Sequence, residues 1–151
     1  MAENKNKVAR LLKNIWISDG VISSAAFNLR PQIHETYISV LRENVDSFHK
    51  DIKIICRQLP VYYASMVVNG IETLETTNLE DDIKFSVKTV DNDNIKSHAG
   101  IFITINGQRL VGGEPFESLE LKRGIPADCI LLEIRKTIAR FASKKILVFK
   151  G

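Results

Sequence analysis

Residues 61–68, which read VYYASMVV, are the stretch that decides the fold of this chain. The run is continuously apolar or β-prone, which is typical of a strand in the middle of a sheet. Pro60 comes directly before it and Asn69-Gly70 directly after it, and such residues commonly bound secondary-structure elements. The sequence therefore predicts a strand over residues 60–68.

The segments before this strand predict a helix and a second strand. An apolar stripe at helical spacing, with Asp46 at the expected N-cap position, predicts a helix over residues 46–58. The stripe consists of Phe48, Ile52, Ile55 and Leu59. Residues 36–42, TYISVLR, are rich in β-formers and predict a strand.

The first 30 residues predict only short elements. Residues 1–7 are expected to be loose, and apolar spacing between residues 8 and 15 predicts one short helix over residues 4–15. Asp19-Gly20 predicts a turn. Ser23 or Ser24 is expected to cap a single helical turn that ends at Phe27.

The segments after residue 70 predict two further strands, a long helix and an edge strand. Polar and apolar residues alternate over residues 83–89, and residues 98–105, HAGIFITI, are followed by the turn pair Asn106-Gly107. Pro126 is expected in the first turn of a helix over residues 127–141. Residues 144–150, KKILVFK, predict an edge strand, because flanking lysines discourage edge-to-edge pairing.

These elements together predict one α+β domain over residues 1–151. We expect a mainly antiparallel sheet of four to six strands and two main helices. The predicted core consists of apolar residues that face inward from these elements, namely Phe27, Ile38, Val40, Ile55, Val61, Tyr63, Phe85, Val87, Ile101, Ile103, Ile130, Ile134 and Ile138.

The composition is that of an ordinary globular domain. Of the 151 residues, 44% are hydrophobic and 26% are charged, which is enough apolar content for a packed core. Cys56 and Cys129 are too few for a disulfide framework or a cysteine-rich zinc site, and we expect both to be reduced and structural. No apolar run reaches the roughly 18 residues of a membrane span, and the N-terminus has no secretory pattern, so a cytoplasmic location is expected.

The sequence predicts neither a metal site nor a cofactor. His34, His49 and His98 share no metal-ligand spacing. Gly112-Gly113, which with Pro115 marks a loop, lacks both common phosphate-loop patterns.

The net charge of +3 is unevenly distributed along the chain. Residues 1–60 carry nine Lys/Arg against six Asp/Glu, and residues 114–151 carry eight against five. Residues 72–93 instead carry seven acidic residues against two basic ones. The ordinary interpretation is a set of solvated faces, and the alternative is that the segregated charge steers a partner of mixed charge.

The first candidate site lies between residues 19 and 43, where charged side chains are concentrated. In the functional interpretation, Arg30 or Arg42 is an anion clamp, because a guanidinium binds phosphate or carboxylate through two parallel hydrogen bonds. In the structural interpretation, Arg30 pairs with Glu35 or Asp19 and holds the loop shut. The candidate residues of this stretch are Asp19, Arg30, Glu35, Ser39 and Arg42.

The second candidate site is the Ser97-His98 step, at the entry to the strand over residues 98–105. Small residues follow His98, so its ring can stand in a concavity as a general base or anion donor. The structural alternative is a hydrogen bond to a neighbouring backbone group. We predict that Arg30 and His98 lie on the same side of the domain and line or support a single site, because both stand at loop–strand junctions.

These residues resemble a family of small, uncharacterised prokaryotic proteins. Its first motif, D-G-x-I-S-x-x-A-F-x-L-R, corresponds here to Asp19, Gly20, Ile22, Ser23, Ala26, Phe27, Leu29 and Arg30. Its second, L-S-V-x-x-x-E, corresponds to Ile38, Ser39, Val40 and Glu43, and a later Ser-His-small step to Ser97-His98-Ala99-Gly100. The resemblance covers roughly residues 17–103, and this chain has Leu41 and Arg42 where the family often has a tryptophan. The family has no established activity, so the resemblance implies positions and not a reaction.

Three classes of function fit the sequence. The first is a small non-catalytic binding or accessory protein that acts through a protein partner in a bacterial multi-protein system of the defence or toxin type. Trp16 is then a candidate hot spot, with a role as core anchor as the alternative. The second is a compact enzyme acting on a nucleotide or phosphate ester, with Arg30 and Arg42 holding the anion and His98 or Glu35 moving a proton.

The third class is a nucleic-acid-binding module that uses the basic C-terminal helix, although no aromatic–basic motif accompanies that charge. We expect no membrane partner.

Overall fold

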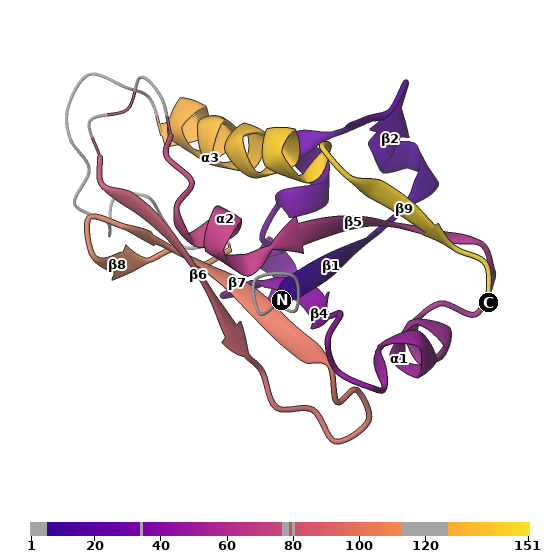
Figure 1. Ribbon diagram of the computed structural model, residues 1–151. Helices are drawn as coiled ribbons and strands as arrows, with labels where there is room; N and C mark the ends of the chain where they lie inside the picture. The colour runs from indigo at the N-terminus through magenta and orange to yellow at the C-terminus, as the bar shows by residue number, and fades with distance from the viewer. Residues whose placement is uncertain (1–5, 34, 77–78, 80, 113–126) are drawn as a thin grey trace.

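The computed structural model describes residues 6–33, 35–76, 79, 81–112 and 127–151 (Figure 1). The elements in chain order are β1 (Lys7–Leu12), η2 (Asn14–Trp16), β2 (Ile17–Ser18), β3 (Val21–Ile22), η3 (Ser24–Phe27), η4 (Pro31–Ile33), β4 (Ile38–Arg42), α1 (Phe48–Ile55), β5 (Val61–Val67), α2 (Val68–Glu72), β6 (Ile83–Thr89), β7 (His98–Ile105), β8 (Gln108–Arg109), α3 (Ala127–Ala142) and β9 (Ile146–Phe149), where η marks a 3₁₀ turn.

Seven strands of the described chain form one sheet. Its main path has the order β6-β7-β4-β1-β5-β9, and the short β8 pairs with β7 off this path. Every pair of neighbouring strands in this sheet is antiparallel. The strands β2 and β3 form a separate hairpin. The predicted α+β fold, with a mainly antiparallel sheet and two main helices, α1 and α3, is confirmed.

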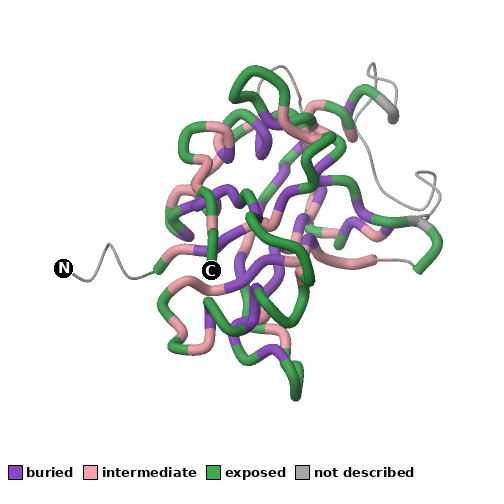
Figure 2. Tube along the Cα trace, turned by 90° about the vertical axis from the view of Figure 1, so that its right-hand side faces the viewer, coloured by how far each residue is buried: buried purple, intermediate pink, exposed green. Residues whose placement is uncertain are grey.

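The two faces of the sheet pack against different helices. Since successive strand residues point to opposite faces, Val8 of β1 belongs to the larger apolar cluster and its neighbour Ala9 to the smaller one. Ile134 of α3 belongs to the larger cluster, whereas Phe48 and Ile52 of α1 belong to the smaller one. Buried residues accordingly follow the strands through the middle of the molecule, and the peripheral loops are exposed (Figure 2).

Two tight turns and one capped turn form where the sequence predicts them. Asp19-Gly20 has φ values of 52° and 75° between β2 and β3, and Asn106-Gly107 has 52° and 85° between β7 and β8. Ser23 caps η3, because its Oγ accepts a hydrogen bond from the backbone N–H of Ala25 at 3.1 Å. The C-terminal strand β9 lies at the edge of the sheet, as predicted.

The helix predicted over residues 4–15 is wrong, because residues 7–12 form β1. This strand lies between β4 and β5, and all six of its residues pair with β5, from Lys7 opposite Val67 to Leu12 opposite Tyr62. An apolar i, i+4 pair marks one face of a helix and equally one face of a strand, so partners distant in sequence decide the outcome. Lys7 belongs to β1, so the loose start predicted for residues 1–7 is wrong at this residue.

The helix α1 is shorter than predicted and starts later. Ser47, and not Asp46, precedes its first residue. Ile55, which the sequence places in the core, is 48% exposed, because it stands at the end of the helix. All other residues of the predicted core are buried.

Asn69-Gly70, which the sequence places directly after the predicted strand, lies in the short helix α2, and β5 ends at Val67 because α2 begins at Val68. His34, Gly113, Pro115 and Pro126 lie outside the described residues. Within the described ranges, no helix is both long and apolar enough to cross a membrane.

Candidate functional site

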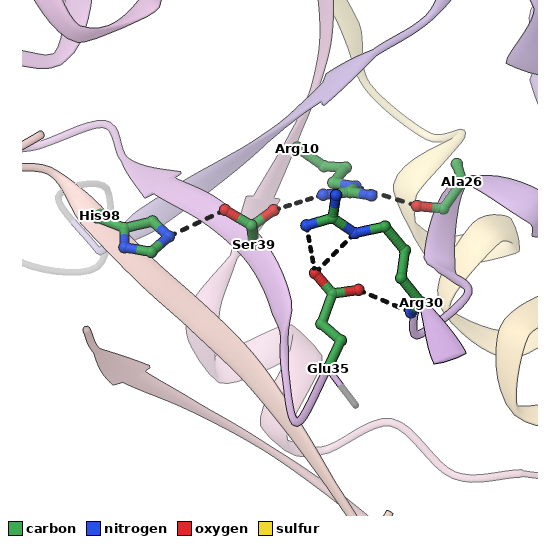
Figure 3. A network of polar contacts seen from close by, with 6 residues as sticks. All are labelled: Arg10, Ala26, Arg30, Glu35, Ser39 and His98. Carbon is green, nitrogen blue, oxygen red and sulfur yellow. Dashed lines mark hydrogen bonds and ion pairs between the residues drawn. The ribbon is translucent and has the colours of Figure 1, made fainter. Parts of the chain in front are cut away.

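The central strands β1 and β4 pair at only two positions, Val8 with Arg42 and Ala9 with Leu41. Arg10, the next residue of β1, fills the place where the ladder stops. Its Nη1 donates a hydrogen bond to the backbone oxygen of Ser39 at 2.8 Å, and its Nε donates to the backbone oxygen of Ala26 at 3.0 Å (Figure 3). One side chain therefore satisfies a backbone acceptor of β4 at the end of the strand pairing and a second acceptor in η3.

Arg10 is a partly buried cation. Burial, with a smaller contribution from the neighbouring positive charge of Arg30, lowers the pKa of its guanidinium to about 10, although Glu35 acts in the opposite direction. This pKa still lies far above neutrality, so Arg10 keeps its charge. Its Nη2 makes no hydrogen bond to the described residues.

Arg30 pairs with Glu35, which is one of the two partners that the sequence leaves open. Nε and Nη2 of Arg30 donate to Oε2 of Glu35 at 3.3 and 3.1 Å, and the backbone N–H of Arg30 donates to Oε1 at 2.9 Å. The loop is closed further by Gly112, whose N–H donates to the backbone oxygen of Glu35 at 2.9 Å. A Cβ at position 112 would lie 2.7 Å from the carbonyl oxygen of Arg30, so this contact requires glycine.

The guanidinium of Arg30 remains accessible in spite of this pairing. Its side chain is 67% exposed, while that of Glu35 is only 12% exposed. An exposed ion pair contributes little stability and exchanges readily with other partners. Arg30 therefore holds its loop closed through Glu35, as the structural interpretation expects. Its exposed guanidinium is also accessible to an anion, as the functional interpretation requires.

Ser39 connects Arg10 to His98. The Ser39 Oγ lies 3.0 Å from Nε2 of His98, while the backbone oxygen of Ser39 accepts from Arg10 (Figure 3). Nδ1 of His98 is buried and has no hydrogen-bond partner among the described residues. Burial lowers the pKa of the His98 ring and so favours its neutral form, and an interaction with the backbone of Val90 opposes this shift. The ring also packs edge-on against Tyr37, with the centroids 5.8 Å apart.

Ser97 fixes the start of β7 and thereby the position of His98. Its N–H and hydroxyl donate to Oδ2 of Asp51 at 2.9 and 2.6 Å, and Ser47 donates to the same oxygen at 2.8 Å. Asp51 and Ser97 are both buried. Burial by itself would raise the pKa of Asp51, but the hydrogen bonds from Ser97 and Ser47 hold it below its ordinary value. The Ser97 half of the step is thus structural.

A groove of about 480 Å³ opens beside Arg10, along the divergence of β1 and β4. Arg10, Lys13 and Arg30 make one part of its lining cationic. The charged ends of Arg10 and Lys13 lie over the ring of Trp16, 5.4 and 5.3 Å from its centroid. Within the described part of the chain, Glu35 is the one acidic residue that lines the groove, and its carboxylate is already bound to Arg30.

A second part of the groove lining is apolar. It includes Leu11 and Leu41 from the strands and Ile55 from the end of α1. Ile55 is nearly half exposed. The groove therefore offers positive charge and apolar surface side by side.

Arg42 and Asp19 do not join this network. Arg42, at the far end of β4, donates to Thr89 Oγ1 and Asn6 Oδ1, each at 3.3 Å. Asp19 is exposed in the turn between β2 and β3 and has no hydrogen bond or ion pair with the other candidates that the structure describes. The structure thus joins Arg30 to Glu35 and Ser39 to His98 as two separate pairs. Arg10 lies between them: it donates to the backbone of Ser39, and its charge interacts with those of Arg30 and Glu35. Arg42 and Asp19 lie apart from both pairs.

Sequence reasoning misses Arg10, the residue at the centre of this network. The available signal is a lone charge between Val8 and Leu12, which a strand interpretation would have placed on the core-facing side of the sheet. The helix predicted for residues 4–15 hides this signal.

No family model, curated protein or solved structure matches this chain. The resemblance to a family of small prokaryotic proteins therefore stays a prediction. The residues that the structure describes contain no group of three or more His, Cys, Asp or Glu that could hold a metal ion.

Proposed function

We propose that this chain is a small non-catalytic binding protein that docks an acidic segment of a protein partner in the groove between β1 and β4. The charge balance of the groove carries the proposal: among the lining residues that the structure describes, Arg10, Lys13 and Arg30 are cationic and Glu35 alone is acidic. Because Glu35 is already paired, an incoming carboxylate meets unneutralised positive charge. It also meets the free Nη2 of Arg10, which can donate a charge-assisted hydrogen bond.

The rigid placement of Arg10 supports this function. Two hydrogen bonds to backbone oxygens already hold its guanidinium, so little side-chain entropy is lost when a ligand binds. The apolar lining at Leu11, Leu41 and Ile55 favours a segment in which apolar residues accompany the acidic ones. Within this proposal the protein acts in the cytoplasm, as an accessory component of a bacterial multi-protein system of the defence or toxin type.

A charge reversal with a matched control tests this proposal. Arg30→Glu removes a groove cation that is 67% exposed and paired with Glu35. Arg140→Glu removes a cation of α3 that is 61% exposed and paired with Glu133, so it is the control. The tagged protein and both variants are used to capture proteins from the native host. We expect a stoichiometric partner with an acidic segment to be lost with Arg30→Glu and retained with Arg140→Glu.

The partner's acidic segment is then titrated into the purified protein while the fluorescence of Trp16, the one tryptophan of the chain, is followed. A saturable change is expected with the segment, and none with a version in which its acids are amidated. Equal capture of all partners by the two variants would rule out docking in this groove.

The contact between Ser39 and His98 favours a second candidate function, an enzyme acting on a phosphate ester or nucleotide. A serine hydroxyl 3.0 Å from a neutral imidazole is the arrangement in which a histidine can take a proton from a nucleophile. In this function Arg30 and Arg42 hold the anion and His98 or Glu35 moves a proton; less favourable to it are the pairing of Glu35 with Arg30 and the hydrogen bonds of Arg42 to Thr89 and Asn6.

Hydrolysis of p-nitrophenyl phosphate and of nucleoside triphosphates separates the two functions. We expect no turnover above the level of the Ser39→Ala and His98→Ala variants. Turnover that disappears in both variants while folding is preserved would favour the enzyme.

A further inference from the structure

One surface of the sheet, on β6, β7 and β8, is both aromatic and basic. The core-facing residues of these strands include Phe85 of β6 and Ile101 of β7, so the alternating residues lie on the other face. The pairing register places Ser86 opposite Phe102, Lys88 opposite Gly100, and both Lys84 and Arg109 opposite Thr104. We call Tyr37, Lys84, Lys88, Phe102 and Arg109 the aromatic–basic surface.

Phe102 is the centre of this surface. Its ring centroid lies 5.3 Å from that of Tyr37. The guanidinium of Arg109 lies over the Phe102 ring at 5.1 Å, and Nζ of Lys88 lies over it at 5.6 Å. The two rings are partly exposed and the two cations are exposed, so an approaching molecule meets all four side chains.

The strand beneath Tyr37 is shaped to receive its ring. A Cβ on Gly100 would lie 2.6 Å from a ring carbon of Tyr37, so the ring rests directly on the backbone of β7. His98 packs against another edge of the same ring. Tyr37 is therefore held in place on the sheet before any ligand arrives.

The cations of this surface are largely unneutralised. Asp82 lies 3.7 Å from Lys84, and both side chains are mostly exposed. Lys88 and Arg109 have no ion pair with an acid in the described part of the chain. Positive charge beside partly exposed aromatic rings fits a ligand that is planar and apolar in one part and anionic in the next.

We propose that the aromatic–basic surface binds single-stranded nucleic acid, with bases stacking on Phe102 and Tyr37 and backbone phosphates held by Lys88 and Arg109. Stacking on aromatic side chains combined with a positively charged track is the general way in which proteins hold single strands. An acidic peptide would use the cations and not the rings, and an apolar peptide would use the rings and not the cations. The site is built from different residues than the groove of the proposed function, and it does not involve the basic C-terminal helix.

Fluorescence anisotropy with labelled oligouridylate and oligothymidylate of about 12 nucleotides tests the proposal, since one binding surface of this kind spans a few to about 16 nucleotides. Phe102→Leu keeps apolar bulk but removes the π-face, and we expect it to weaken binding by about tenfold or more. Phe102→Tyr is expected to restore binding to nearly that of the original protein. The slope of log affinity against log salt concentration is negative, and Lys88→Ala is expected to reduce its magnitude by about 0.7.

Lys136→Ala is the matched control, because it removes an exposed lysine from α3, which packs on the opposite face of the sheet. It is expected to keep the affinity within about twofold. Binding of either oligonucleotide with the expected effects of the variants supports the proposal. The oligonucleotide that binds more tightly than the other identifies RNA or DNA as the better ligand. The absence of binding to both at low salt, full affinity of Phe102→Leu, or an equal loss in Lys136→Ala overturns it. Labelled polyglutamate that binds as tightly and depends equally on Phe102 also overturns it, in favour of a protein ligand.

Discussion

Arg10 donates a hydrogen bond to the backbone oxygen of Ser39 at 2.8 Å, across the point where β1 and β4 stop pairing. The same guanidinium donates to Ala26 in η3. One side chain thus connects two strands and a 3₁₀ turn, and the break in the sheet becomes a groove with a fixed cation in it. The hydroxyl of Ser39 then extends the network to His98 on the neighbouring strand.

Replacing Arg10 is expected to destabilise the fold. Arg10→Ala leaves the carbonyls of Ala26 and Ser39 without their donors, which costs about 1–3 kcal/mol when such groups are shielded from water. Lys13→Ala is the control, because Lys13 also lies over Trp16 but is exposed. Urea denaturation gives the unfolding midpoints of the Arg10→Ala and Lys13→Ala variants. Equal midpoints would contradict the bridging role of Arg10.

Arg30 and His98 are expected to act on one site. Ser39 lines the groove and contacts His98, while Arg30 lines the groove directly. In a double-mutant cycle of Arg30→Ala and His98→Ala, we expect coupling of about 0.5 kcal/mol or more in the affinity for polyglutamate, followed by Trp16 fluorescence. Strictly additive effects, or effects on stability alone, would separate His98 from the groove.

Asp51 is expected to make the stability of the protein sensitive to acid. Its pKa in the folded protein lies below the ordinary value of 3.8, so the ionised carboxylate stabilises the fold. This contribution is fully present above that ordinary value and is lost as the pH falls through the lower, folded-state pKa. Unfolding free energies of the original protein and Asp51→Asn should therefore converge at acidic pH. If the difference in unfolding free energy between the original protein and Asp51→Asn stays constant down to about pH 2, Asp51 is not the group that makes stability sensitive to acid.

Ile134 is expected to be essential for packing of α3 on the sheet. It is 1% exposed, and Ile134→Ala should cost about 2–5 kcal/mol of unfolding free energy. Leu132, on the same helix, is 37% exposed, and Leu132→Ala should cost much less. The unfolding free energies of the two variants are compared by thermal or urea denaturation. A similar loss of stability in both would mean that the wrong helix face has been assigned to the core.

The two thiols are expected to be reduced and structural, with different reactivities. Burial raises the pKa of Cys56, which lowers its thiolate fraction at neutral pH, whereas Cys129 is exposed. A thiol reagent such as DTNB should therefore modify Cys129 well before Cys56 in the folded protein. Replacing both cysteines with serine should preserve binding of the partner and lower stability moderately. Loss of binding at unchanged stability would instead indicate a redox or nucleophilic role.

Local sequence pattern determined much of this fold. The strands β6 and β7 begin and end at the predicted residues because alternation, and a β-prone run closed by Asn106-Gly107, are signals that neighbouring residues carry by themselves. The same holds for the cap at Ser23, because its hydroxyl oxygen and the donor N–H of Ala25 are two residues apart. Apolar spacing likewise predicted the buried face of α3.

Tertiary structure decided the identity of β1 and the composition of both binding surfaces. The apolar spacing of residues 8–15 is compatible with a helix, and β1 becomes a strand through its pairing with β4 and β5, which are distant in sequence. The groove needs Arg10 and Arg30 beside one another, and the aromatic–basic surface needs Lys88, Phe102 and Arg109 on adjacent strands. The physical reason is that local conformation follows from short-range sterics and hydrogen bonds, whereas the register of strands distant in sequence, which sets which side chains meet, depends on how the whole apolar surface is buried.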